Sequence, residues 1–158
     1  MGSMSAHTHY PVIIVGAGPG GLAVAAALLD QGLSAKELLV LDKGEIGQSW
    51  LDYPTDTRLL SESAPHQDDN QIAGVATSEV FPHIPHPNHL MYQKYLAHVA
   101  AVKQIPTRLN TQVAKVIYDG TAAEFWVVLR DGSHLTAQFL VWAAGMYATP
   151  RDQLMMEG

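Results

Sequence analysis

The sequence predicts an α/β fold in which a parallel sheet carries a three-stranded antiparallel β-meander, and three observations predict it. A short apolar run, residues 10–15, is followed by a glycine-rich turn and then by an Ala- and Leu-rich stretch, residues 22–31. A second apolar run, residues 37–41, completes a strand–helix–strand unit, which favours a parallel pair with a right-handed crossover. The last part of the chain then has three strand-like segments that are separated by Asp-Gly steps.

Both apolar runs, YPVIIV and ELLVL, are predicted to be buried strands, because unbroken apolar runs are typical of parallel strands covered on both faces. The stretch between them is rich in strong helix formers, and Gly32 follows it where a helix-ending glycine is expected.

A long irregular connection is predicted for residues 43–88, which carry Gly, Pro, Ser and Asp throughout. We expect Asp68 and Asp69 within it to form a solvated acidic patch. Residues 88–103 are predicted to form a helix, because apolar residues recur there at helical spacing, and Pro106 marks its end.

The antiparallel meander is predicted from residues 113–118, 124–130 and 134–142. Asp119-Gly120 and Asp131-Gly132 separate these segments, and Asp-Gly is a frequent hairpin step. We expect the last strand (FLVWAAG) to run back into the core.

Composition bounds the class of protein. The 158 residues are 47% hydrophobic and 15% charged, which suits one α/β domain. The formal charge is −6 with basic residues scattered singly, so nucleic-acid binding is not expected, and the longest apolar stretch is too short to cross a membrane. We expect a cytoplasmic protein. The absence of cysteine removes every thiol mechanism from this chain.

The glycine-rich turn carries the strongest functional signal. Gly16, Gly18 and Gly21 occupy the three positions of the G-x-G-x-x-G fingerprint, between a predicted strand and a predicted helix. The first glycine permits the tight turn, the second lets a pyrophosphate approach the main chain, and the third lets helix and sheet pack closely. The sequence therefore predicts a Rossmann-like FAD/NAD(P)-binding domain.

An acidic residue supports this interpretation. Asp42 lies 21 residues beyond Gly21, at the end of the second strand, where the fingerprint requires a carboxylate for the ribose hydroxyls. A carboxylate there would repel a 2′-phosphate, which argues against NADP at this site. The alternative is that Asp42 only caps a strand at the surface.

At this point the chain resembles the flavin-containing monooxygenase and Baeyer–Villiger monooxygenase group of the flavoprotein oxidoreductases with two dinucleotide-binding domains. Three motifs carry the resemblance, which extends from Val12 to Pro150. The first is the VGAGPGG turn with Asp42. Residues 45–50 (EIGQSW) are similar to the group's E-x-G-G-x-W segment, and Ala-Ala-Gly at 143–145 with the following proline is similar to its A-T-G-x-x-x-x-P segment.

Two residues depart from these motifs: Gln48 stands where the group has Gly, and Ala144 where it has Thr. The resemblance implies FAD as cofactor, with NADPH and a small-molecule substrate only in a full-length protein. It also implies cofactor contacts from Gly16, Gly18, Pro19, Gly20, Gly21, Asp42, Lys43, Gly47, Gln48, Ser49, Trp50, Arg58, Val113, Ala144 and Gly145.

Simpler interpretations of these residues stay open. Trp50 could be an ordinary core aromatic, Arg58 a solvated charge, and residues 143–145 plain close packing at a strand end. His83, His86 and His89 recur at every third residue, but no carboxylate accompanies them, so we expect no metal site.

The resemblance also sets the expected domain organisation. We expect residues 1–9 to be a tag remnant and flexible N-terminus, and residues 10–158 to be an incomplete FAD-binding domain. The NADPH domain and the C-terminal FAD segment would lie elsewhere, on a complementary chain or in a longer protein, and a homo-oligomer is equally compatible. No catalytic residue can be named.

Two other functions remain open: a non-catalytic module that binds the ADP moiety of a dinucleotide, and part of a disulfide-reductase-like flavoprotein.

Overall fold

Six strands form one mixed sheet in the computed structural model, which describes residues 8–145. The strand order is β5-β2-β1-β8-β7-β6. Strands β5, β2, β1 and β8 run parallel, and β8, β7 and β6 run antiparallel. The strands span His9–Val15 (β1), Leu38–Leu41 (β2), Thr107–Arg108 (β5), Val113–Asp119 (β6), Glu124–Leu129 (β7) and His134–Trp142 (β8). The predicted fold class is confirmed.

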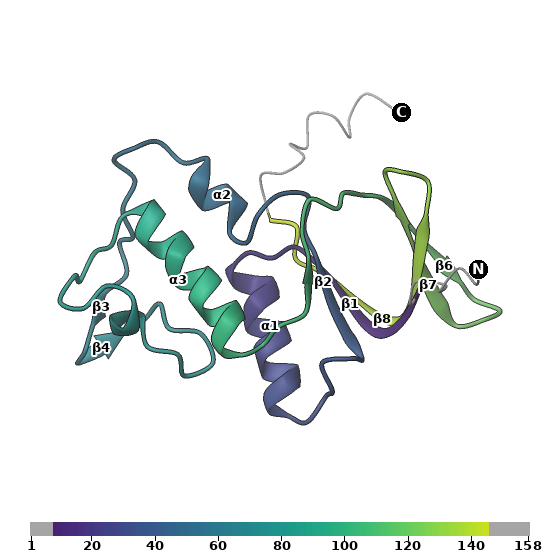
Figure 1. The fold of residues 1–158 in the computed structure, drawn as a ribbon, viewed down its shortest axis with the longest axis horizontal. Coiled ribbons are helices and arrows are strands. Elements are labelled where there is room, and N and C mark those ends of the chain that lie inside the picture. Colours follow the sequence, from purple (N-terminus) through teal and green to yellow (C-terminus); the bar gives the residue numbers. More distant parts are fainter. Residues whose placement is uncertain (1–7, 146–158) are drawn as a thin grey trace, which may run out of the picture.

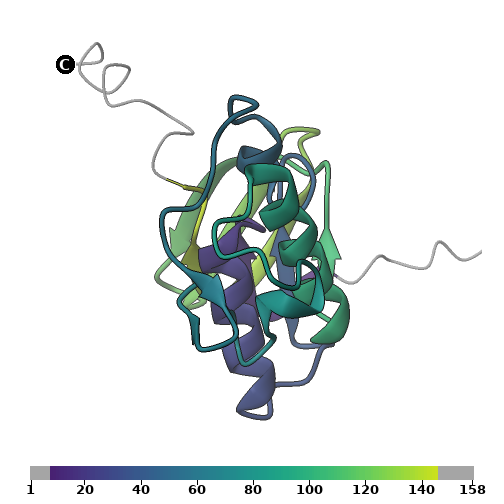
Figure 2. The same cartoon turned by 90° about the vertical axis from the view of Figure 1, so that its left-hand side faces the viewer.

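Helices cover one side of the parallel strands. They are α1 (Pro19–Asp30), the short α2 (Gln48–Leu51) and α3 (His89–Val102). Figure 1 shows α1 and α3 on one side of β1 and β2, with β6 and β7 on the other side. Figure 2 shows α1 and α3 next to each other in front of the strands. Within residues 8–145 no helix is long and apolar enough to cross a membrane.

Each face of the parallel strands belongs to a different apolar core. Val12 and Ile14 of β1 point to the helical side, where they pack with residues of α1 and α3. Ile13 and Val15, the alternate residues, pack on the other side with Val127 and neighbouring residues of the meander. Because side chains alternate along a strand, a strand covered on both faces must be apolar throughout. This accounts for the unbroken run at 10–15.

Strand β8 joins the two parts of the sheet. Its first residues, 134–137, pair with β7, whereas residues 136–142 pair with β1. The strand therefore belongs to the meander at its beginning and to the parallel sheet at its end. The predicted return into the core holds for its pairing with β1, but the side chains of Phe139 and Trp142 remain exposed.

Both long helices lie close to their predicted positions. In α3 the Asn88 side chain accepts a hydrogen bond from Met91 N (2.9 Å), which caps the first turn. Helix α1 begins at Pro19, three residues before the predicted start at Leu22, since proline suits the first helical position and the following glycines are tolerated there.

The two hairpin turns differ in how they use their Asp-Gly steps. Gly132 has φ +87°, so the second turn requires a glycine. In the first turn the positive φ of 54° falls on Ala123 instead. There the Asp119 side chain accepts hydrogen bonds from Thr121 N (2.8 Å) and Ala122 N (3.2 Å), which makes the aspartate the turn-forming residue.

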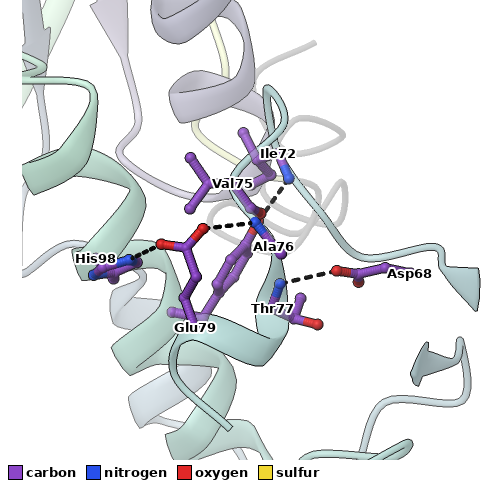
Figure 3. A network of polar contacts seen from close by, with 8 residues as sticks. Asp68, Ile72, Val75, Ala76, Thr77, Glu79 and His98 are labelled. Carbon is purple, nitrogen blue, oxygen red and sulfur yellow. Dashed lines mark hydrogen bonds and ion pairs between the residues drawn. The ribbon is translucent and has the colours of Figure 1, made fainter. Parts of the chain in front are cut away.

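Besides α2, the long connection between β2 and α3 contains three short elements: β3 (Ser63–Ala64), β4 (Gln67–Asp68) and a 3₁₀ turn, η1 (Thr77–Glu79). Figure 3 shows how polar contacts bind this segment together and fasten it to α3. The Glu79 carboxylate accepts from Ala76 N (3.2 Å) and contacts His98 Nε2 of α3 (2.7 Å). The hydrogen bond from His98 holds the pKa of Glu79 below its usual value.

Asp68 departs from the expectation of a solvated acidic patch. Its Oδ2 accepts a hydrogen bond from Thr77 N (2.9 Å), and its Oδ1 is buried. Asp69 is exposed as expected. The difference arises because the main chain of η1 supplies a donor to one of the two adjacent carboxylates.

Tyr95 fastens the same segment from within the core. Its buried hydroxyl donates to Val75 O (2.7 Å) and accepts from Ile72 N (2.6 Å). We therefore expect Tyr95→Phe to lower the free energy of unfolding by about 1–3 kcal/mol, because two buried main-chain groups lose their partner. Urea denaturation measures this change. Tyr92→Phe is the matched control, since the Tyr92 hydroxyl bonds to none of the described residues; an equal loss in both variants would contradict the assignment.

Burial also makes the fold sensitive to alkali. It raises the pKa of Tyr95 and of Tyr92 to about 12, from 10 for a free tyrosine. A raised folded-state pKa stabilises the fold fully below the unfolded value, and that stability is lost as the pH rises through the folded value. We expect the unfolding free energy to fall between pH 10 and pH 12, and to fall less steeply in Tyr95→Phe. A slope that is identical in the variant would exclude Tyr95 as a source.

Candidate functional site

The glycine-rich turn packs main chain directly on main chain. Gly16 has φ +114°, and a Cβ atom on it would lie 2.1 Å from Ala143 O at the end of β8. A Cβ on Gly21 would lie 1.8 Å from Gly16 O. The turn is held from both neighbouring strands, because Gly16 N donates to Leu41 O and Ala143 N donates to Val15 O, both at 2.7 Å. Gly16 and Gly21 are therefore required by the fold itself.

Gly18 and Gly20 stand in a different environment. A Cβ on either would meet no described heavy atom within 4 Å, so both main chains face open space. They flank Pro19 at the start of α1, whose first turn has no acidic residue. The first N–H groups of a helix have no partner within it and attract anions. This end of α1 is consequently open to a phosphate group.

Asp42 ties the turn to the end of β2. Its Oδ2 accepts from Ala17 N (2.7 Å) and its Oδ1 from Gly44 N (2.8 Å). The carboxylate thus has a structural role that the fingerprint interpretation did not include. Each carboxylate oxygen has a second acceptor position, so these bonds leave capacity for a ligand hydroxyl.

Two adjoining cavities lie at the carboxyl ends of β1, β2 and β8. The larger, of about 700 Å³, extends from the start of α1 to α2, and the smaller, of about 180 Å³, extends toward the start of β6. They share five lining residues: Gly16, Asp42, Lys43, Ala144 and Gly145. Ligands of open α/β sheets bind at the carboxyl ends of the strands, and small-molecule pockets measure about 300–1,000 Å³. The two cavities together suit an extended ligand.

Trp50 lies in the wall of the larger cavity, between two aromatic rings. Its ring makes edge contacts with Tyr53 (5.2 Å between centroids) and Tyr92 (4.7 Å). The main-chain oxygen of Trp50 contacts Nδ1 of the buried His89. Gln93 Nε2 also donates to Ile46 O (3.0 Å). One face of α3 therefore supports the segment that lines this cavity, and sequence reasoning did not identify that support.

Gly47 lies beneath the same segment. It has φ +67°, its N–H donates to Ala17 O (2.9 Å), and a Cβ would lie 2.9 Å from Leu96 Cδ1. Gln48, which stands where the related group has a second glycine, accepts from Glu45 N (3.0 Å) and donates to Asp52 Oδ1 (3.0 Å). The Gln48 side chain therefore cross-links residues 45 and 52 of this segment through hydrogen bonds.

Most of the predicted contact residues are brought together at the two cavities. Those that line one or both are Gly16, Gly18, Pro19, Gly20, Asp42, Lys43, Gln48, Ser49, Trp50, Val113, Ala144 and Gly145. Gly21 and Gly47 pack behind the lining. Arg58 lines neither cavity, because it pairs with Asn88 in an isolated bridge and its Nη1 donates to His86 O (3.3 Å). Pro150, the last residue of the third motif, lies outside the described residues.

Several lining residues were missed. Thr111, Gln112 and Trp142 line the smaller cavity, and Asp52 and Tyr53 line the larger. Each lies within three residues of a predicted contact residue, and this closeness in sequence is the signal that could have identified it. Among residues 8–145 no group of three or more His, Asp or Glu side chains could hold a metal ion.

Comparison with known proteins decides the family to which the chain belongs. Residues 13–157 match the model of the family described as pyridine nucleotide-disulphide oxidoreductase. The chain belongs to this pyridine nucleotide-disulphide oxidoreductase family. The matched residues include the glycine turn, Asp42 and all strands of the mixed sheet except the beginning of β1.

The curated relatives of this chain include monooxygenases. A probable indole-3-pyruvate monooxygenase, YUCCA1 of Arabidopsis thaliana, is 29% identical over 142 residues, which are 90% of this chain and 32% of the relative. An indole-3-pyruvate monooxygenase of Oryza sativa subsp. japonica is also 29% identical and is covered to 32%. The chain thus spans about a third of the length of the curated relatives it matches.

Solved structures of two kinds share the fold. Bacillithiol disulfide reductase (YpdA) of Bacillus cereus has a TM-score of 0.75 at 32% identity, covering 90% of this chain and 41% of that one. An oxidized steroid monooxygenase bound to NADP has a TM-score of 0.71 at 25% identity, covering 87% and 26%. OTEMO in complex with FAD and NADP, at 20% identity and a TM-score of 0.67, covers 89% and 26% and shows the fold alone. The resemblance inferred from the motifs is confirmed.

The glycines of the turn differ in what a methyl group would do. We expect Gly21→Ala to destabilise the fold by about 3 kcal/mol, the upper end for overpacking, because its Cβ would overlap Gly16 O. Gly18→Ala should cost less than about 1 kcal/mol, since its main chain is extended and the site is open. Thermal and urea unfolding of both variants measure the contrast. Equal stability of the two variants would contradict the described packing.

Proposed function

We propose that this chain is the FAD-binding portion of an NAD(P)H-dependent, monooxygenase-like flavoprotein oxidoreductase. The observation that carries the proposal is the pair of joined cavities, which runs from the start of β6 past Asp42 and the open end of α1 to Trp50. This arrangement matches the parts of a dinucleotide in order: base, ribose, pyrophosphate and second ring system. The relatives named above are consistent with it, since they include monooxygenases.

The residues present fit FAD. The smaller cavity would hold the adenosine, with Val113 beside the base and Asp42 beside the ribose. Gly18, Gly20 and the N-terminus of α1 would receive the pyrophosphate, because their main chains face open space. Gln48, Ser49 and Trp50 would line the flavin end together with Ala144 and Gly145. Arg58 stays outside this set, given its contacts with the 86–88 segment.

Bound FAD would supply the redox chemistry, taking electrons from NADPH and passing them to oxygen or another small acceptor. The residues of this chain would bind and orient the cofactor. Residues 10–158 would thus be one portion of the functional unit, with an NADPH domain and the rest of the flavin pocket supplied by further sequence or by a complementary chain. A small-molecule substrate, no nucleic-acid partner, a homo-oligomer and a cytoplasmic location belong to the same proposal.

A second candidate is part of a flavoprotein disulfide reductase. It is favoured by the 32% identity to bacillithiol disulfide reductase. This stretch of sequence contains no cysteine, so a redox thiol pair would have to come from another part of the protein or from its substrate. Consumption of NADPH by the whole protein distinguishes the two: dependence on oxygen supports a monooxygenase or oxidase, and dependence on a disulfide supports the reductase.

Cofactor identity is tested by the visible absorption spectrum of the purified chain after addition of FAD and desalting, with chromatography of what denaturation releases. We expect retained, released FAD in the wild type. Gly18→Leu should lose at least about tenfold in FAD affinity while remaining folded, because its side chain would occupy the phosphate position. Val24→Leu, on the exposed side of α1, is the control. Undiminished FAD binding by Gly18→Leu would contradict the phosphate assignment.

A further inference from the structure

Trp142 is an exposed aromatic residue at the edge of the candidate site. It is the last residue of β8, and 61% of its surface is accessible. A tryptophan carries a large apolar area, which is stabilised when another group covers it. None of the three sequence motifs assigns it a role.

The strand register places Trp142 relative to the smaller cavity. Trp142 pairs with Val15 of β1, and Val15 pairs with Leu41 of β2. Paired residues of neighbouring strands point to the same face of a sheet, and this is the face that the meander covers. All three residues line the smaller cavity. The Trp142 side chain therefore stands beside an apolar floor made by Val15 and Leu41.

Another part of the wall of this cavity is the segment 111–113, where the chain enters β6. This segment is fixed by main-chain bonds: Thr111 N donates to Asp42 O (2.8 Å) and Arg130 N to Gln112 O (2.9 Å). The cavity of about 180 Å³ is too small for a dinucleotide but suits one ring system. It shares Asp42 and four other lining residues with the larger cavity, so a flat ring bound in it would be well placed to carry a polar, phosphate-bearing chain toward the start of α1.

We propose that Trp142 is a specificity-determining contact for the adenine base, against which its indole ring packs. The inference rests on the proposed function, in which the base is the adenine of FAD. It deepens that proposal by assigning a base contact to the Trp142 side chain, in addition to Val113 in the cavity lining. The indole favours a ligand that carries an aromatic base over one that lacks it, because the contact is apolar and a flat base stacks favourably on an aromatic ring.

The other tryptophans provide contrasts. Trp50 lines the larger cavity at the flavin end, and Trp126 of β7 lines neither of these two cavities. Trp126 is 38% exposed and stacks on His134 at 4.6 Å between ring centroids. Trp126→Ala is therefore a matched control, which removes an indole of the same chain away from the site.

The experiment measures the affinity of the full chain for ADP, FMN and FAD by calorimetry. Trp142→Ala should weaken ADP and FAD binding by about 5- to 150-fold, the range for loss of a stacked base, and leave FMN binding unchanged. Trp126→Ala should bind all three like the wild type. Trp142→Phe should keep most of the ADP affinity while losing the quenching of tryptophan fluorescence by ADP, a readout that holds even if Trp142→Ala does not fold.

Each outcome of these measurements supports or overturns either the base contact or the proposed function. Wild-type ADP affinity in Trp142→Ala, or unchanged quenching in Trp142→Phe, overturns the base contact and leaves the proposed function standing. A wild-type chain that binds ADP but not FAD, with the Trp142 effect intact, overturns the flavin assignment and supports the contact. A wild-type chain that binds neither ADP nor FAD overturns both.

Discussion

Three main-chain segments converge at Gly16 with no space for a side-chain carbon between them. The end of β1, the end of β8 and the first turn of α1 approach one another through Gly16, Ala143 and Gly21. This contact sets the distance between the helix and the sheet, and it also leaves Gly18 and Gly20 facing outward. Close packing inside the turn and open space outside it are thus two results of the same geometry. Asp42 then fixes the turn against β2 through Ala17 N.

Helix α3 supports the other end of the site. Its side chains hold the α2 segment from behind: His89 contacts the main-chain oxygen of Trp50, and Gln93 donates to that of Ile46. Leu96 of the same helix packs against Gly47. Tyr95, on the same helix, fastens the long connection through Ile72 and Val75. One amphipathic helix therefore organises a stretch of nearly fifty residues that has little regular structure of its own.

Much of this structure was predictable because the chemistry is local in sequence. The unbroken apolar run at 10–15, the glycines at 16, 18 and 21 and the helical spacing in 88–103 each depend on neighbouring residues, and they give strands, turn and helix close to their predicted bounds. The two-residue strand β5 has no local pattern; it exists because Val40 and Leu41 of β2 offer it an edge.

The features that the sequence did not predict depend on contacts between residues far apart in the chain. Asp68 differs from Asp69 only because η1 presents a main-chain donor to it, and the role of His89 depends on Trp50, 39 residues away. Trp142 escaped notice for a similar reason, since its position beside the smaller cavity follows from the pairing of β8 with β1. Of the predicted site residues, those in contiguous motifs gather at the cavities, whereas Arg58, proposed from a looser pattern, does not line them.

The pairing of β1 with β8 has a consequence for synthesis of the chain. On the ribosome, residues 9–15 emerge well over a hundred residues before the strand that completes their sheet. Contacts so distant in sequence form late and slow folding, because the intervening chain must first be ordered. Until β8 docks, one flank of β1 is an unpaired edge, which attracts other strands. The nascent chain therefore passes through a stage in which its glycine-rich turn is translated but lacks the contact of Gly16 with Ala143 that encloses it in the folded protein.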